Sequence, residues 1–213
     1  MSGGAVPATK ADSTRSEVFS TQTDEALMGR VGRGRADAFE VLVDRHANSV
    51  TTFCYAFCRD RDQADDLAQE VFLRVFRNAR SYKPVAKFTT WLYRVAANLC
   101  INEAKKAKLR KTVSLDGPMD SDPDATRIVE KMATGDPGPL TEAERHEASK
   151  LIEQAIQALP EDQRVTLILV ERQNLPYKDI AEILDVTVSA VKMRVKRARE
   201  NLREALKFLE AAK

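Results

Sequence analysis

The chain has 213 residues, of which 43% are hydrophobic, and a formal net charge of +2 at pH 7. This apolar content suffices for packed cores, but no apolar run reaches the length of about 18 residues expected of a membrane-spanning helix. The chain starts without a secretory signal pattern, and its three cysteines are too few for a secreted disulfide scaffold. These features argue against an exported or membrane-inserted protein and predict a soluble protein of the cytoplasm.

The first part of the chain is predicted to form one small helical domain, residues 24–108, after a lead-in of residues 1–23 that carries little information on the fold. Thr89 or Thr90 is a natural N-cap for its last helix. The third helix has an apolar stripe at helical spacing that runs from Ala64 to Ala79 and includes Phe76. The expected helices span about 24–31, 37–59, 62–78 and 90–108.

The next segment, residues 109–143, has the composition of a flexible acidic linker. Between Thr112 and Glu144 there are eight acidic and two basic residues, together with several prolines and glycines. Such a segment cannot bury enough apolar area to offset the entropy of ordering it. A second helical domain, residues 144–213, is expected after it, with helical stretches at about 140–159, 161–173, 176–184 and 188–209. The predicted fold is therefore all-α, with two small helical domains joined by a flexible acidic linker.

The clearest local motif is YKDIAEILDVTVSAVKMRVKRAR, from Tyr177 to Arg199. It predicts two helices joined by a tight turn, in which Asp185 tolerates a left-handed backbone and Thr187 caps the second helix. When Val191 and Val195 point inward, the opposite side of the second helix is basic, which suits DNA phosphates. A basic face that contacts only solvent is the alternative interpretation. The positions able to face a ligand are Ser189, Ala190, Lys192, Met193, Lys196 and Arg197.

Two stretches, DQADDLAQEVFLRVFRNARSY and FTTWLYRVAANLCINEAKK, resemble region 2 of bacterial sigma factors. A third, LPEDQRVTLILVERQNLPYKDIAEILDVTVSAVKMRVKRARENL, resembles region 4. Their order and the degenerate linker between them are similar to the extracytoplasmic-function group. The resemblance implies a promoter-specificity subunit that binds the clamp helices and flap of core RNA polymerase. Promoter DNA would be read as duplex at the −35 element and as melted non-template strand at the −10 element.

The resemblance also implies roles for individual residues. Tyr82 and Phe88 are candidate walls of a pocket for an unstacked base, whereas Trp91 is assigned to the core. Polymerase contact is expected from Asp65, Asp66, Gln69 and Glu70. Contact with the −10 element is expected from Ser81, Tyr82, Lys83, Lys87, Asn98, Asn102 and Lys105. Contact with the −35 element is expected from the six residues of the second helix given above.

Other functions remain open on the sequence alone. One is a free-standing helix-turn-helix regulator whose N-terminal bundle senses a ligand or dimerises, and another is an interaction module that sequesters a partner. No catalytic constellation is found, so neither enzymatic activity nor a cofactor is expected. Cys54 and Cys58, with His46 two turns earlier, are interpreted as core residues and not as a metal site. The resemblance implies regulation by an anti-sigma factor, which is often linked to the membrane.

Overall fold

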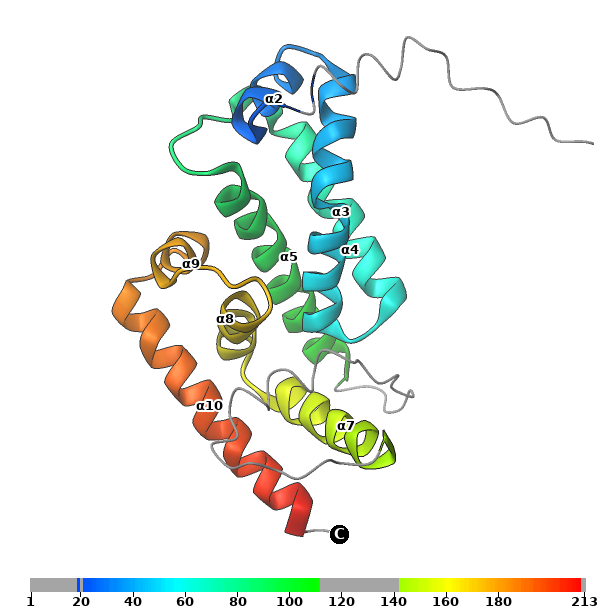
Figure 1. The fold of residues 1–213 in the computed structure, drawn as a ribbon, viewed down its shortest axis with the longest axis vertical. Helices are drawn as coiled ribbons and strands as arrows, with labels where there is room; N and C mark the ends of the chain where they lie inside the picture. Colours follow the sequence, from blue (N-terminus) through cyan, green and yellow to red (C-terminus); the bar gives the residue numbers. More distant parts are fainter. Residues whose placement is uncertain (1–18, 20, 112–141, 212–213) are drawn as a thin grey trace, which may run out of the picture.

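The computed structural model describes residue 19, residues 21–111 and residues 142–211, and every regular element in these ranges is helical (Figure 1). The all-α prediction is confirmed. Most of the lead-in and residues 112–141 of the predicted linker lie outside the described residues. The N-terminal half contains α2 (Asp24–Val31), α3 (Ala36–Cys58), α4 (Arg61–Arg77), the 3-10 turn η1 (Ala79–Ser81) and α5 (Phe88–Lys111). The C-terminal half contains α7 (Glu142–Ala158), α8 (Glu161–Glu171), α9 (Tyr177–Leu184) and α10 (Val188–Ala211).

The N-terminus of α4 is capped by a residue next to it in the sequence, whereas that of α5 is capped by a distant residue. Asp60 caps α4, because its side chain accepts a hydrogen bond of 2.8 Å from the Gln63 amide. The predicted N-cap of α5 at Thr89 or Thr90 is wrong, since the helix already begins at Phe88. The amide of Phe88 donates to Glu25 Oε1 at 2.7 Å. This cap comes from α2, which is distant in the sequence, and no local pattern could reveal it.

The core of the N-terminal half lies between α3, α4 and α5. Leu42, Phe53, Val71 and Leu92 are completely buried there, and α4 carries the apolar stripe that its sequence predicts. Phe76 is the exception. It was expected on the inner side of α4, but it is 47% exposed near the end of the helix and packs on Phe39, with 5.0 Å between the ring centroids.

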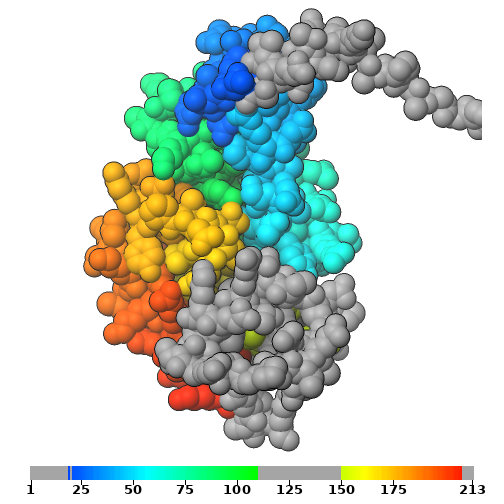
Figure 2. All heavy atoms as spheres, viewed as in Figure 1, coloured from blue at the N-terminus to red at the C-terminus, as the bar shows by residue number. Residues whose placement is uncertain are grey.

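The two halves pack against one another, which the sequence did not indicate. α8 and α9 lie beside α5, and α10 lies on the far side of α8 and α9 (Figure 1). A single apolar cluster continues from the N-terminal core into α8 and α9, where it includes Val165, Ile168 and Ile180. A smaller cluster joins α7, α8 and α10 around Leu202. Figure 2 shows the halves in contact on this face of the molecule.

Among the described helices, none combines the length and the apolar character needed to cross a membrane.

Candidate nucleic-acid interface

The predicted helix-turn-helix is formed by α9 and α10. Asp185 adopts the expected left-handed conformation, with φ of 52°, and closes α9. The amide of Val186 donates to the carbonyl of Ala181 at 3.0 Å. Thr187 caps α10, as predicted, by accepting a hydrogen bond of 3.1 Å from the Ala190 amide. The turn therefore fixes α10 firmly relative to α9.

The outer face of α10 is basic and open. Val191, Val195 and Ala198 are buried against α8 and α9, so the opposite side of the helix faces solvent. Ala190 is half-buried. Five of the six residues predicted to contact the −35 element are exposed on this face: Ser189, Lys192, Met193, Lys196 and Arg197.

Not all basic side chains of α10 are free to bind a ligand. Arg194 pairs with Asp162 at 3.4 Å and Arg199 pairs with Glu171 at 2.7 Å, and both acids belong to α8. These two arginines hold α10 on α8. Between residues 188 and 200, the basic side chains that remain for a ligand are those of Lys192, Lys196 and Arg197. Lys196 lies 3.8 Å from Glu200.

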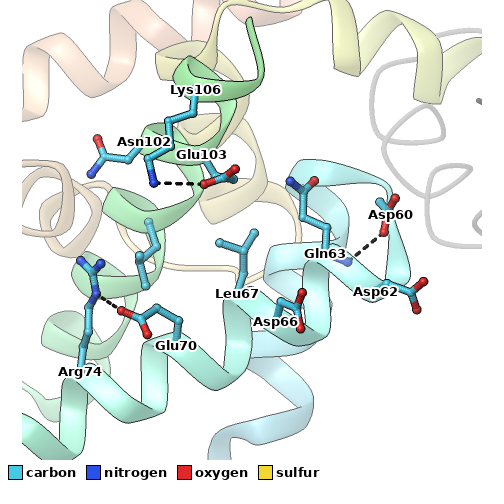
Figure 3. Close-up of a pocket in the computed structure, with 11 residues that line it drawn as sticks. Asp60, Asp62, Gln63, Asp66, Leu67, Glu70, Arg74, Asn102, Glu103 and Lys106 are labelled. Carbon is cyan, nitrogen blue, oxygen red and sulfur yellow. Dashed lines mark hydrogen bonds and ion pairs between the residues drawn. The ribbon is translucent and has the colours of Figure 1, made fainter. Parts of the chain in front are cut away.

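An acidic groove separates α4 from α5 (Figure 3). Its volume is about 810 Å³, and its lining includes Asp66 and Glu70 of α4 and Asn102 of α5. Arg74 hydrogen-bonds Glu70 at 2.7 Å and holds the pKa of that carboxyl below its usual range. Acids outnumber bases in the lining, which consists of Asp60, Asp62, Gln63, Asp66, Leu67, Glu70, Arg74, Leu99, Asn102, Glu103 and Lys106.

The four acidic and amide residues predicted to bind polymerase share the outer side of α4. Asp65, Asp66 and Gln69 are exposed, and Asp65 borders a second groove of about 460 Å³ toward α3. One and two turns further on, Leu73 is 48% exposed and Phe76 47% exposed. The acidic side of α4 thus continues into an exposed apolar end. Sequence reasoning missed it, although Leu73 falls off the apolar stripe and could have suggested it.

The loop before α5 is only partly arranged as predicted. Ser81, Lys83 and Lys87 are exposed, and the ring of Tyr82 packs on Trp91 with 5.0 Å between their centroids. Phe88 is completely buried, so the interpretation of Phe88 as a wall for an unstacked base is wrong. The core of the N-terminal half needs that ring.

The hydroxyl group of Tyr82 is buried beside this loop. Its hydroxyl oxygen has no hydrogen-bond partner among the described residues, and burial raises the pKa of its phenol. A buried donor without a partner is costly. Tyr82 is therefore the one aromatic side chain of the predicted pocket that is half-exposed and still has an unused donor.

One side of α5 carries two kinds of contact. Asn98, Asn102 and Lys105 are exposed on it, as a −10 contact requires. One turn before Asn98 on the same side, Arg94 donates through Nε to the carbonyl of Glu182 in α9 at 3.2 Å. Lys87, just before the helix, lies 3.3 Å from Asp179 of α9. One predicted −10 residue, Lys87, is therefore engaged with the C-terminal half.

The cysteines and His46 belong to different surroundings. Cys54 and Cys100 are buried with their sulfur atoms 3.9 Å apart, and the pKa of Cys58 is raised to about 11 by burial. His46 pairs with Asp24 at 2.8 Å instead. Within the described ranges, no group of His, Cys, Asp and Glu side chains is arranged to hold a metal ion.

Comparison with known proteins identifies the family. The family described as Sigma-70 region 2 matches residues 42–110, and that described as Sigma-70, region 4 matches residues 149–202. The RNA polymerase sigma-H factor of Pseudomonas aeruginosa is 33% identical over 198 residues, covering 90% of this chain and 98% of that protein. The ECF RNA polymerase sigma factor SigW of Bacillus subtilis is 34% identical, covering 84% of this chain and 95% of that protein. The chain belongs to the extracytoplasmic-function (ECF) sigma factors.

The fold agrees with this family. The sigma factor RpoE of Bartonella quintana, solved in complex with the anti-sigma factor NepR, superposes with a TM-score of 0.57 at 20% identity, covering 79% of this chain and 96% of that one. In this sigma factor α3, α4 and α5 carry region 2, and α7 from residue 149, α8, α9 and α10 carry region 4. Sigma factors bind core RNA polymerase and promoter DNA through these regions, and they are initiation factors, not enzymes.

Proposed function

We propose that this ECF sigma factor positions polymerase with α4, reads a −35 element with α10 and captures the melted −10 strand with α5 and the loop before it. The proposed working units are residues 24–108 and 144–213, joined by the acidic segment 109–143. The observation that carries the proposal is that the basic side chains of α10 fall into two groups, one that pairs with α8 and one that faces solvent. Two arginines bind α8, whereas Lys192, Lys196 and Arg197 face outward.

Contact with the −35 element is assigned to the outer face of α10. Lys192 and Lys196 suit backbone phosphates, because lysine neutralises them and releases counterions. Arg197 can reach a guanine edge with two hydrogen bonds. Ser189, Ala190 and Met193 lie near the start of the same face and complete the proposed contact.

Contact with the −10 element is assigned to α5 and its loop. Asn98 and Asn102 are exposed one turn apart, and an asparagine amide can pair with a base edge. Tyr82 supplies a half-exposed aromatic ring on which an unstacked base can stack, and groups other than Phe88 complete the pocket. The remaining proposed contacts are Ser81, Lys83, Lys87 and Lys105.

Contact with polymerase is assigned to the outer side of α4. The acids and amide at Asp65, Asp66, Gln69 and Glu70 suit a basic partner, and the exposed Leu73 and Phe76 add apolar area next to them. We assign this surface to the clamp helices of the large subunit, and the outer part of region 4 to the flap.

An anti-sigma factor is the proposed regulator. The support is the anti-sigma factor NepR bound to the structurally similar RpoE of Bartonella quintana. The proposed location of this chain is the cytoplasm, where a regulator that is itself linked to the membrane would hold it close to the membrane. Neither a cofactor nor a metal ion is part of the proposal.

The test is run-off transcription by core polymerase, with and without this protein, over promoter fragments of its own genome. Discrete start sites that depend on the protein are expected. Binding of a defined duplex at physiological salt, with no binding to polymerase, would instead indicate a free-standing regulator. Binding to polymerase in a parallel assay distinguishes that outcome from a poor choice of promoters.

A further inference from the structure

Arg59 and Glu153 form a buried ion pair at the seam between regions 2 and 4. Arg59 closes α3 in region 2, and Glu153 lies in the middle of α7. Their side chains are only 4% and 1% exposed. Charged side chains are rarely buried so completely unless they are paired. The seam is therefore built around a specific charge contact and not only around apolar side chains.

The backbone at Arg59 supports this interpretation. Its φ of 61° is left-handed, and helix ends of this kind strongly favour glycine. Arginine has no conformational advantage there, so its side chain must contribute something that glycine cannot. The guanidinium lies over the ring of Tyr55 at 4.9 Å and reaches Glu153 from that position.

A second contact closes the same end of α3. The carbonyl of Phe57 accepts hydrogen bonds from Gln157 at 3.1 Å and from Arg164 at 3.3 Å. Both donors belong to region 4, and a cation at a helix C-terminus is favourable. At the other edge of the seam, Lys108 of α5 pairs with Glu161 of α8 at 2.7 Å.

The closed arrangement holds the two proposed reading faces close together. Arg94 contacts Glu182, and Ser189 follows Glu182 by seven residues, so Ser189 lies within roughly 25 Å of that contact along the chain. Asn98 is one helical turn beyond Arg94, about 6 Å. The −35 and −10 elements are, by the positions that name them, about 25 base pairs apart, roughly 85 Å of duplex at about 3.4 Å per base pair. The closed form cannot engage both elements at once.

We propose that Arg59 and Glu153 form an interdomain latch that keeps the free sigma factor closed, and that regions 2 and 4 must separate at this seam before both promoter elements are read. The inference rests on the proposed function, in which both elements are engaged together. The segment of residues 112–141 can span at most about 100 Å, enough for the separation.

An ion pair suits a latch that has to reopen. Opening returns both charges to water, and their hydration offsets most of the attraction that is lost. Removing one partner has a different effect, because the remaining charge stays dehydrated in the closed form. The single substitutions should therefore open the molecule, whereas replacing both residues by apolar side chains should keep it closed.

The experiment measures the distance between dyes at Asp44 of α3 and Glu204 of α10, both exposed, by single-molecule energy transfer in the free chain. The unmodified chain should be closed. Glu153→Gln should raise the ratio of open to closed molecules roughly tenfold or more, since an unpaired buried charge disfavours the closed form. Arg59→Met combined with Glu153→Leu should return the ratio to that of the unmodified chain.

Controls keep the test independent of folding and of polymerase. Glu171→Gln removes a carboxylate of α8 that pairs with Arg199 of α10, and it should leave the distance unchanged. Lys108→Glu alters an exposed residue at the edge of the seam and should open the molecule slightly even if Glu153→Gln fails to fold. An open unmodified chain, or closed distributions for both Glu153→Gln and Lys108→Glu, would overturn the latch. Failure of the proposed function would show separately, as absence of polymerase binding.

Discussion

The two DNA-reading surfaces of this sigma factor differ in how accessible they are. On α10 the charges that hold the helix, Arg194 and Arg199, are separate from those that face solvent. Around α5 the residues that hold the two halves together lie next to those that face solvent. Lys87 and Arg94 contact α9, and Asn98 and Asn102 are exposed beside them. The proposed −35 surface is thus complete in the closed chain, whereas the proposed −10 surface is complete only after the halves separate.

This difference suggests an order of events. Region 4 can meet duplex DNA without any change, but region 2 has to release α9 before its loop can hold a melted strand. Polymerase supplies the binding energy for that release in our account, because it contacts the outer side of α4, which the seam leaves exposed. The predictions below are arranged by expected size and concern the two surfaces in turn.

The largest effect is expected on α10. Lys192→Ala combined with Arg197→Ala should lower promoter-directed transcription roughly 100-fold, since a phosphate contact and a base contact are lost together. Arg199→Ala on the same helix removes a basic side chain that pairs with Glu171 of α8. This variant should leave promoter affinity within about twofold at moderate salt. Run-off transcription measures both. Equal losses of transcription in the two variants would contradict the separation of the basic side chains of α10 into a DNA-facing group and a group that pairs with α8.

A smaller effect is expected in the acidic groove. Asp66→Lys should weaken binding to core polymerase roughly tenfold, because it places a like charge against a basic partner. Asp44→Lys, at an exposed position of α3, is the matched control and should bind normally. Fluorescence anisotropy with labelled protein measures both affinities. If the two variants bound equally well, α4 would not be the polymerase surface.

On α5 the expected change is smaller still. Asn102→Ala should weaken binding of the complete holoenzyme to a fork-junction DNA roughly fivefold to tenfold, the size of one lost base contact. Binding of a −35 duplex should not change. Asn48→Ala, an exposed asparagine on α3, serves as the control. Unchanged fork-junction affinity in Asn102→Ala would remove this residue from the −10 surface.

The smallest effect is a dependence of the closed form on pH. Lys108 hydrogen-bonds Glu161 and holds the pKa of that carboxyl below its usual value of 4.5. A carboxyl whose pKa is lowered in the closed form stabilises that form above pH 4.5, and this contribution disappears as the pH falls through the lowered pKa. The contribution should be under about 1 kcal/mol, because the Lys108 side chain is largely exposed and solvent screens the pair. Energy transfer from pH 6 to pH 3 should show slightly more opening in the unmodified chain than Lys108→Gln shows.

Local features of the fold were predictable from the sequence, and distant ones were not. The turn at Asp185 and the cap at Thr187 depend on neighbouring residues, so the sequence indicated both. The cap of Phe88 by Glu25 and the pairing of Arg59 with Glu153 join residues far apart in the chain. No periodicity or spacing reports such contacts, because Glu25, Arg59 and Glu153 each look like an ordinary surface charge in the sequence.

The same limit applies to the candidate site. Five of the six residues predicted on α10 lie on its exposed face, and Ala190 is half-buried. The sequence could not show which basic side chains of the helix pair with α8. The apolar stripe of α4 placed Phe76 inside, because a stripe does not reveal where the core ends, and the family resemblance placed Phe88 beside the DNA. Both positions depend on which helices pack around them, and that information is tertiary.

Footprinting of the holoenzyme on a promoter found by run-off transcription would test whether the two halves read separate elements. We predict two protected segments about 25 base pairs apart, with permanganate-reactive thymines at the downstream one only. Lys192→Ala with Arg197→Ala should remove the upstream protection first. A single protected segment that forms without polymerase, and no reactive thymines, would contradict the assignment of the two halves to two promoter elements.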